Sequence, residues 1–385
     1  MPGTNRDRWF VLAAGTFAQA TYSAIWSGMA VMSVALESRY DLSLGQVGVL
    51  ISASLAGSVV SLVPWGLLAD RIGERVALLT GVGACGLALL AGAETHSFWA
   101  LLVCLLLAGF AGASVQSASG RAVMYWFAPN ERGLALGIRQ TAIPIGGFAT
   151  ALALPPIVRA GGVDWGIRTL GIACVTSATV GWLFVRDATR DDEHIEVGPP
   201  PLRDKRIWQM SVGSALVLAP QMCIVGFTVL FLHKQRGLST AEAGYVLAAV
   251  QALGIGARIA AGQFSDARGS RLKPLRALAV ALAAATVLAG IVISAPLWLL
   301  IPALVLCGVI SMSWNGLSFA AAAELAGRAR SGAAIGLQQS LLNASGAVYP
   351  GAFGVLVAAT SWRMGFLAVA VLPLAGWQLL RELPG

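Results

Sequence analysis

The chain has 385 residues, of which 57% are hydrophobic and only 11% are charged. So few charged side chains cannot cover the surface of a water-soluble protein of this size, and the composition indicates a protein that folds in lipid. A formal net charge of +8 is common among proteins that bind nucleic acid, but the placement of the basic residues gives another explanation.

Long apolar stretches run through the whole chain, and each is long enough to cross a bilayer as a helix, which takes roughly 20 residues. They are continuous and carry no regular polar alternation, so helices are favoured over barrel strands. We expect an all-α membrane protein of twelve transmembrane helices in two six-helix bundles. The predicted spans are 9–36, 45–69, 76–95, 97–126, 134–158, 166–186, 207–233, 241–264, 274–294, 297–325, 332–358 and 363–381.

One sustained polar stretch separates the two halves and includes Asp191, Asp192, Glu193 and His194. It predicts a solvated linker. The expected domains are therefore an N-terminal bundle (1–186), a cytoplasmic linker (187–206) and a C-terminal bundle (207–385). The first apolar stretch is too long for a cleavable signal peptide and lacks a convincing cleavage site, so we expect none.

The lysines and arginines gather in alternate connections. If the even-numbered connections and both ends lie in the cytoplasm, most basic residues fall on that side, as the positive-inside rule requires. This predicts a bacterial inner-membrane protein with both termini in the cytoplasm, and it explains the charge without nucleic acid. All five cysteines fall within apolar spans and lack paired spacing, so neither disulfides nor a metal site are expected.

A charged motif follows the second span and returns after the eighth. Residues 66–75 read GLLADRIGER and residues 262–271 read GQFSDARGSR, at a constant separation of 196 residues. A second repeat links 133–140 with 332–339, and two copies of both patterns indicate a duplicated bundle. Such a hinge can act as a charged clasp, since its aspartate can bind a helix N-terminus. Its residues are Gly66, Asp70, Arg71, Gly73, Arg75, Gly262, Asp266, Arg268, Gly269 and Arg271.

Polar side chains interrupt several spans near their middles. In the first span these include Gln19, Thr21 and Ser23. Because polar groups are costly against lipid, they should face the bundle interior or a wet cavity, or bond between helices. Residues at similar depths in both halves suggest a central cavity, and depth alone nominates Tyr22, Gln116, Gln251, Asn315, Gln339 and Asn343 as substrate-binding residues.

Two arginines inside the spans, Arg139 and Arg258, are the strongest candidates for ligand contact. A guanidinium cannot shed its charge, so it needs water, a carboxylate or an anionic ligand. The spans offer almost no acidic partner. The alternative is that both side chains snorkel to the membrane surface, since each lies only about 8 to 9 Å from its helix end.

Two further features of the first half bear on its packing. Arg121 lies near the end of the fourth span, and it is expected to snorkel or to pair with Asp70 or Glu131. Pro144, followed by two glycines, should bend the fifth span.

With this hinge, its degenerate copy and six spans on either side of the linker, the chain resembles the major facilitator superfamily. The resemblance implies alternating access by two bundles around a central substrate site. It also implies that Asp70 and Arg71 belong to a cytoplasmic gate. The sequence 256–262, with Arg258 four residues before the hinge glycine, is similar to the monocarboxylate and oxalate–formate types of facilitator, in which that arginine binds the substrate carboxylate.

The chain departs from that pattern in two places. Gly254 stands where the pattern tends to carry an acid, and the first span has no lysine. A coupling proton, a counter-anion and simple uniport therefore all stay open.

We expect a monomeric transporter of a small organic anion, without a cofactor. The alternatives are an exporter of drugs or other metabolites in the same superfamily, or a membrane sensor that binds a ligand without moving it. An intramembrane enzyme is disfavoured, because His96, His194 and His233 lie outside the predicted membrane core.

Overall fold

The computed structural model describes residues 5–42, 44–185 and 200–383. Within these ranges the chain is helical and contains no strand. Most of the predicted linker, residues 187–199, lies outside the described residues. Its last part contains a short 3-10 turn, η1 (Pro201–Arg203), before the next long helix.

The chain forms two compact units. Unit 1 comprises residues 1–128, 139–201 and 326–340, and unit 2 comprises 129–138, 202–325 and 341–385. Two short segments, 129–138 and 326–340, thus belong to the unit formed mainly by the other half of the sequence. The copy 332–339 of the second repeat lies within segment 326–340, and residues 133–138 of the other copy lie within segment 129–138.

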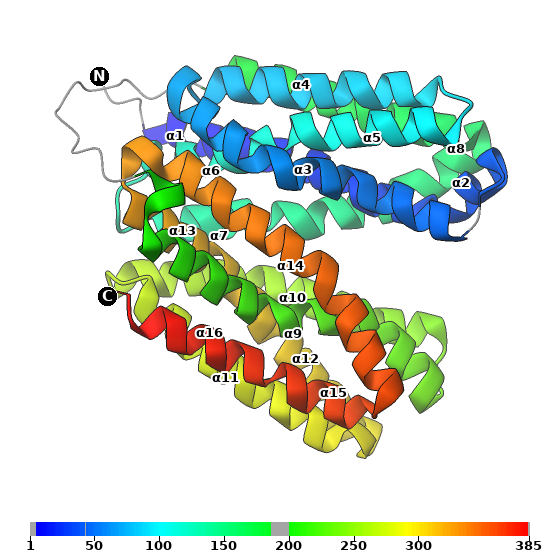
Figure 1. Ribbon diagram of the computed structural model, residues 1–385, viewed down its shortest axis with the longest axis vertical. Helices are drawn as coiled ribbons and strands as arrows, with labels where there is room; N and C mark the ends of the chain where they lie inside the picture. Colours follow the sequence, from blue (N-terminus) through cyan, green and yellow to red (C-terminus); the bar gives the residue numbers. More distant parts are fainter. Residues whose placement is uncertain (1–4, 43, 186–199, 384–385) are drawn as a thin grey trace. The chain divides into compact units, whose positions relative to one another are not determined.

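The first half of the chain contains eight described helices (Figure 1). These are α1 (Asn5–Val31), α2 (Ser33–Tyr40), α3 (Leu44–Ile72), α4 (Glu74–Ala93), α5 (Phe98–Gly112), α6 (Ser114–Trp126), α7 (Arg132–Gln140) and α8 (Ala142–Phe184). In unit 1, α1 and α4 both pack along α8, and α3 packs along α5.

The second half repeats this plan. Its elements are α9 (Lys205–Arg236), α10 (Thr240–Ala267), α11 (Leu272–Ile291), η2 (Val292–Ser294), α12 (Leu297–Ser313), α13 (Asn315–Ala326), η3 (Arg328–Arg330), α14 (Ser331–Ala359), α15 (Trp362–Val369) and α16 (Val371–Arg381). In unit 2, α9 packs along α16 and α10 along α12.

Ten helical segments among the described residues are long and apolar enough to cross a membrane. One of them, Arg132–Phe184, has 53 residues and covers the fifth and sixth predicted spans, which are separated by the non-helical backbone of Gly162. The first predicted span is not among the ten. Its helix α1 carries Gln19 and neighbouring polar residues, which lower its hydropathy.

The expected irregularity in the fifth span lies at Thr141, between α7 and α8. Pro144 has no backbone N–H, so the carbonyl of Gln140 receives no helical hydrogen bond from that position. The helix resumes with the N–H of Ile145 donating to the carbonyl of Thr141 at 3.1 Å. The interruption of the helix at Thr141 therefore follows from Pro144, which comes three residues later in the chain.

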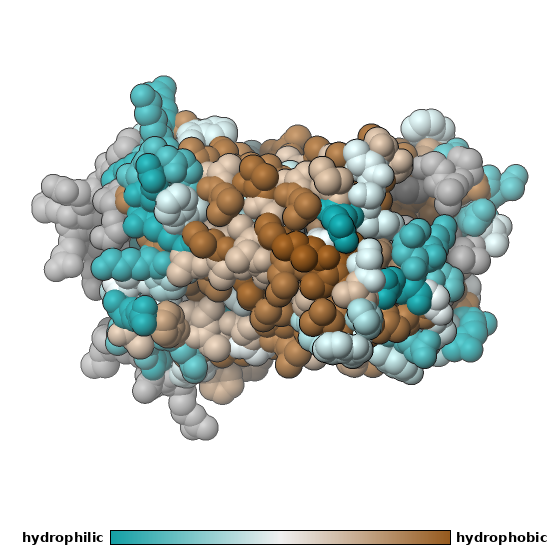
Figure 2. Space-filling model, turned by 90° about the horizontal axis from the view of Figure 1, so that it is seen from below, coloured by the Kyte–Doolittle hydropathy of each residue, from teal (hydrophilic) through white to brown (hydrophobic). Residues whose placement is uncertain are grey.

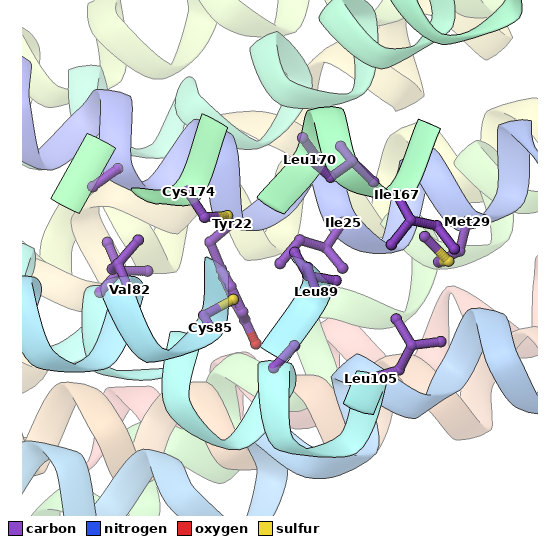
Figure 3. Close-up of a cluster of buried hydrophobic side chains, with 14 of the residues drawn as sticks. Tyr22, Ile25, Met29, Val82, Cys85, Leu89, Leu105, Ile167, Leu170 and Cys174 are labelled. Carbon is purple, nitrogen blue, oxygen red and sulfur yellow. The ribbon is translucent and has the colours of Figure 1, made fainter. Parts of the chain in front are cut away.

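Apolar side chains fill the interior of unit 1 and also cover much of the outer surface. Figure 3 shows part of the interior, where Ile25 and Met29 of α1 lie near Leu89 of α4 and Leu170 of α8. The face drawn in Figure 2 is apolar across its middle and hydrophilic toward both ends, as expected of a protein surrounded by hydrocarbon. Large apolar side chains such as Ile291, Trp298 and Val371 are exposed on unit 2.

Small residues let α3 and α5 approach closely, as is usual between membrane helices. A Cβ atom added to Gly109 would lie 2.0 Å from the carbonyl oxygen of Ser54, and one added to Gly57 would lie 2.1 Å from that of Leu106. Both neighbours are backbone atoms, which cannot move without separating the helices.

We therefore expect Gly109→Ala to lower the stability of the protein by roughly 1–3 kcal/mol, the usual cost of overpacking. Gly147→Ala in α8 is the matched control, because nothing lies within 4 Å of its added Cβ. The apparent melting temperatures in detergent compare the two. Equal melting of both variants would contradict close packing of α3 on α5.

Candidate functional site

The first hinge motif brings the carboxylate of Asp70 to the start of α14. Its Oδ1 accepts a hydrogen bond from the N–H of Gly332 at 3.2 Å, and its Oδ2 accepts one from the N–H of Ala333 at 3.1 Å. All three residues belong to unit 1. The first N–H groups of a helix lack partners within the helix, and the helix dipole favours a negative charge there.

Arg121 of α6 completes this group. Its Nε lies 3.2 Å from Oδ1 of Asp70, and its Nη1 lies 2.6 Å from Oε1 of Glu74. Its guanidinium also lies over the ring of Tyr125. The predicted pairing of Arg121 with Asp70 is thus confirmed, whereas the sequence did not indicate Glu74 as a partner.

The second motif repeats the geometry in unit 2. Asp266 accepts hydrogen bonds from the N–H groups of Gly133 and Leu134, at 3.0 and 2.8 Å, at the start of α7. Here the motif's own arginine, Arg271, contacts Asp266 and also lies 3.1 Å from Oε1 of Glu324 on α13. In both copies the aspartate binds the start of a helix. The arginine that pairs with it comes from α6 in the first copy and from the motif itself in the second.

The glycines of the motif have two separate functions. A Cβ on Gly66 would lie 2.6 Å from the carbonyl oxygen of Gly332, and one on Gly262 would lie 2.3 Å from that of Gly133. These two glycines allow one helix to approach the next. Gly73 and Gly269 instead have positive φ angles, 88° and 60°, at the turn that follows, a conformation that glycine adopts without steric cost.

The other basic residues of the motifs lie at the surface of their units. Arg75 donates from Nε to the carbonyl of Trp182 at 2.7 Å, and its guanidinium lies 3.9 Å from the centre of that indole ring. Arg268 lies 4.1 Å from the ring of Phe264, and Arg71 is exposed.

Arg139 is fully buried in unit 1 and does not snorkel. Its Nε donates to the hydroxyl of Ser119 at 2.7 Å, and its Nη2 donates to the backbone carbonyl of Gln116 at 2.5 Å. Its Nη1 lies 3.3 Å from Oε1 of Gln140, which also accepts a 3.0 Å hydrogen bond from Nε2 of Gln19. The structure thus brings two predicted residues, Arg139 and Gln116, into one polar network.

Arg258 is also buried, in unit 2. Its Nε donates to the carbonyl of Met312 at 2.8 Å, near the interruption between α12 and α13 at Trp314. Asn315, another predicted residue, begins α13 and is 7% exposed. Nε1 of Trp314 and Oδ1 of Asn315 are buried and have no hydrogen-bond partner among the described residues.

The remaining predicted residues have different surroundings. Tyr22 lies in the apolar interior of unit 1, between Cys85 and Cys174 (Figure 3), and its hydroxyl is 3.4 Å from the carbonyl oxygen of Gly109. Gln339 of α14 is buried, whereas Gln251 of α10 and Asn343 of α14 are half-buried. Tyr22, Gln116, Arg139 and Gln339 belong to unit 1, and Gln251, Arg258, Asn315 and Asn343 to unit 2.

A family model described as Major Facilitator Superfamily matches residues 11–350. The chain belongs to the major facilitator superfamily. It is therefore a multi-pass membrane transporter rather than an enzyme. Among the described residues of this facilitator, no three His, Cys, Asp or Glu side chains are grouped so as to hold a metal ion.

An uncharacterised MFS-type transporter of Mycobacterium tuberculosis (strain CDC 1551 / Oshkosh) is 33% identical over 377 residues, which cover 97% of this facilitator and 84% of that relative. A probable chloroplastic anion transporter of Arabidopsis thaliana is 30% identical over 159 residues, or 41% of this chain and 30% of the relative. The solved structure of the proton:xylose symporter XylE with 6-bromo-6-deoxy-D-glucose matches with a TM-score of 0.78 at 13% identity. That match covers 99% of this chain and 96% of the symporter, and it shows a shared fold.

Several residues of these networks were not predicted from the sequence as functional residues, among them Gln19, Gln140 and Glu74. Gln19 is visible in the sequence as a polar interruption of an apolar helix, but its partner lies 121 residues away. Gln140 directly follows Arg139, and Glu74 lies within the hinge motif itself. Position alone would have nominated the last two.

Asp70→Asn should lower the stability of this facilitator by roughly 1–3 kcal/mol, since it weakens hydrogen bonds to a charged partner and to two N–H groups. Glu74 still pairs with Arg121 in the variant, which keeps the loss in this range. Asp41→Asn is the control, because Asp41 is exposed and its left-handed backbone suits asparagine. If the two variants melt together in detergent, the contacts of Asp70 contribute nothing to stability.

Proposed function

We propose that this facilitator carries small organic anions, specifically carboxylates, across a bacterial inner membrane by alternating access. The observation that carries the proposal is the burial of two guanidinium groups, one in each unit. Among other contacts, Arg139 and Arg258 donate hydrogen bonds to neutral oxygens of hydroxyl, amide and backbone carbonyl groups.

A guanidinium keeps its positive charge when it is buried, because it does not lose its proton. Removing that charge from water is costly, and a few dipoles offset only part of the cost. A carboxylate offsets more, because it brings a full negative charge and two oxygens that match the planar fork of the guanidinium. An anionic solute is therefore the ligand that best complements each of these arginines.

The partial relative from Arabidopsis thaliana supports the same class of solute, since it is named a probable anion transporter. Its alignment covers less than half of this chain, so it bears on the class of solute and not on its identity. We infer a monomer that takes its solute together with a coupling proton or in exchange for a counter-anion, with both termini in the cytoplasm.

The two hinge motifs supply the gating in this proposal. In each, a carboxylate holds the start of a helix through two N–H groups, and an arginine holds the carboxylate. These bonds are polar and partly buried, so they can form in one conformation and be replaced by water in another. A transporter that alternates between states requires contacts of this reversible kind.

A thermal-shift titration of the purified protein tests the choice of solute. We expect carboxylates to raise the melting temperature, because a ligand of the native state stabilises it by mass action. Arg258→Gln should weaken that binding by roughly 10- to 100-fold, the value of hydrogen bonds to a charged group. Arg363→Gln is the matched control, since Arg363 is exposed on α15.

Two other results would contradict the proposed transport of carboxylates. Stabilisation by cationic drugs that is unchanged in Arg258→Gln would favour an exporter of such compounds. Carboxylate binding without any uptake or exchange in proteoliposomes would favour a sensor.

Asp70→Asn separates gating from binding. We expect transport of a bound carboxylate in proteoliposomes to fall by about ten-fold or more, because the clasp on α14 is weakened. The affinity measured by thermal shift should stay within about two-fold of the native value. An equal loss of affinity and transport would show that Asp70 does not act in gating alone.

A further inference from the structure

The network around Arg139 contains a buried acceptor that points to the chemistry of the solute. Oε1 of Gln19 is buried and has no hydrogen-bond partner among the described residues, although Gln19 itself is fully buried in α1. Buried amide oxygens are almost always bonded in native proteins, so this atom requires a donor.

The direction of the hydrogen bonds follows from the charge of Arg139. A guanidinium only donates, so the Gln140 atom that faces Nη1 of Arg139 must be the amide oxygen. The Gln19 atom that faces the same oxygen must then be its NH₂ group. Rotating either amide by 180° would break this chain, and Oε1 of Gln19 is therefore left over as an acceptor.

The unfilled acceptor lies close to the arginine. Gln19 and Arg139 both donate to one oxygen, at 3.0 and 3.3 Å. Two groups bonded to the same atom lie within roughly 6 Å of each other. A solute whose carboxylate reaches the guanidinium can therefore place a hydroxyl group on the neighbouring carbon near Gln19.

Unit 2 offers a second acceptor of the same kind beside its own arginine. Asn315 begins α13 three residues after Met312, whose carbonyl accepts from Arg258. Its Oδ1 is also buried without a partner among the described residues, and the side chain is 7% exposed. Each unit thus combines a buried cation with a buried amide oxygen that needs a donor.

We propose, for each unit taken by itself, that the amide oxygen beside its arginine (Gln19 in unit 1, Asn315 in unit 2) accepts a hydrogen bond from a hydroxyl group of an anion, so that the solutes are hydroxylated carboxylates such as 2-hydroxy acids and sugar acids. This inference rests on the proposed transport of carboxylates. An acid without hydroxyl groups would leave the amide oxygens of Gln19 and Asn315 without a hydrogen-bond donor. A site that bonds to a hydroxyl group binds the analogue without it much more weakly.

Matched acids test the inference on the full-length protein. The pairs are glycolate with acetate, L-lactate with propionate, and D-gluconate with hexanoate, each titrated by thermal shift. We expect the hydroxylated member of at least one pair to bind ten-fold tighter or better. Gln19→Met, which keeps the length of the side chain and removes the amide, should reduce that preference by roughly ten-fold.

Gln209→Met is the matched control, because Gln209 bonds to the carbonyl of Leu379 and to Glu382, neither of which belongs to the proposed site. It should keep the native preference. If Gln19→Met does not fold, Asn315→Leu provides the same comparison in unit 2.

The outcomes distinguish this inference from the proposal on which it rests. Equal binding of both members of every pair would overturn the hydroxyl inference and leave carboxylate transport standing, with water as the donor to Gln19. A preference that survives in both variants would overturn the roles of Gln19 and Asn315. Failure of every acid to bind would remove the proposed function and this inference together.

Discussion

The structure of each hinge depends on one interaction, a carboxylate that accepts hydrogen bonds from two N–H groups in the first turn of a helix. Asp70 makes it with α14 and Asp266 makes it with α7. The contact requires that no Cβ stand between the helices, which explains Gly66 and Gly262. It also requires a turn directly after the helix, which explains Gly73 and Gly269. The spacing of the motif therefore reflects three requirements: a glycine where the helices meet, an aspartate that binds the helix start and a glycine in the turn that follows.

Four arginines differ in their surroundings. Arg121 and Arg271 each contact two carboxylates, one of which is a hinge aspartate. Arg139 and Arg258 lie within the spans and donate hydrogen bonds to neutral oxygens. The first pair belongs to the hinges, and the burial of the second pair is the basis of the proposal of an anionic solute.

Much of the fold could be predicted from the sequence, because apolar length acts locally along the chain. The helices and the two hinge copies belong to this class. For Arg121 the sequence left snorkelling, Asp70 and Glu131 open, and the structure shows contacts with Asp70 and Glu74. The polar network around Arg139 could not be predicted from the sequence. Gln19 and Gln140 are 121 residues apart, and neither segment indicates that it contacts the other. Depth likewise nominated Tyr22, but only packing shows that its ring lies among Cys85, Cys174 and other apolar groups (Figure 3).

The duplication shows which parts of the hinge the fold uses twice. At the repeat separation of 196 residues the hinge glycines and aspartates have counterparts, so both halves retain the same contact between an aspartate and a helix start. The charged side chains around that contact differ, since Arg71 and Glu74 correspond to Ala267 and Ser270. The two membrane arginines also lack counterparts: Arg258 corresponds to Leu62, and Arg139 corresponds to Gln338 at the separation of the second repeat. Because hinge and membrane arginines alike occur in one copy only, the proposal of a solute beside Arg139 and Arg258 rests on their burial and charge and not on the repeat.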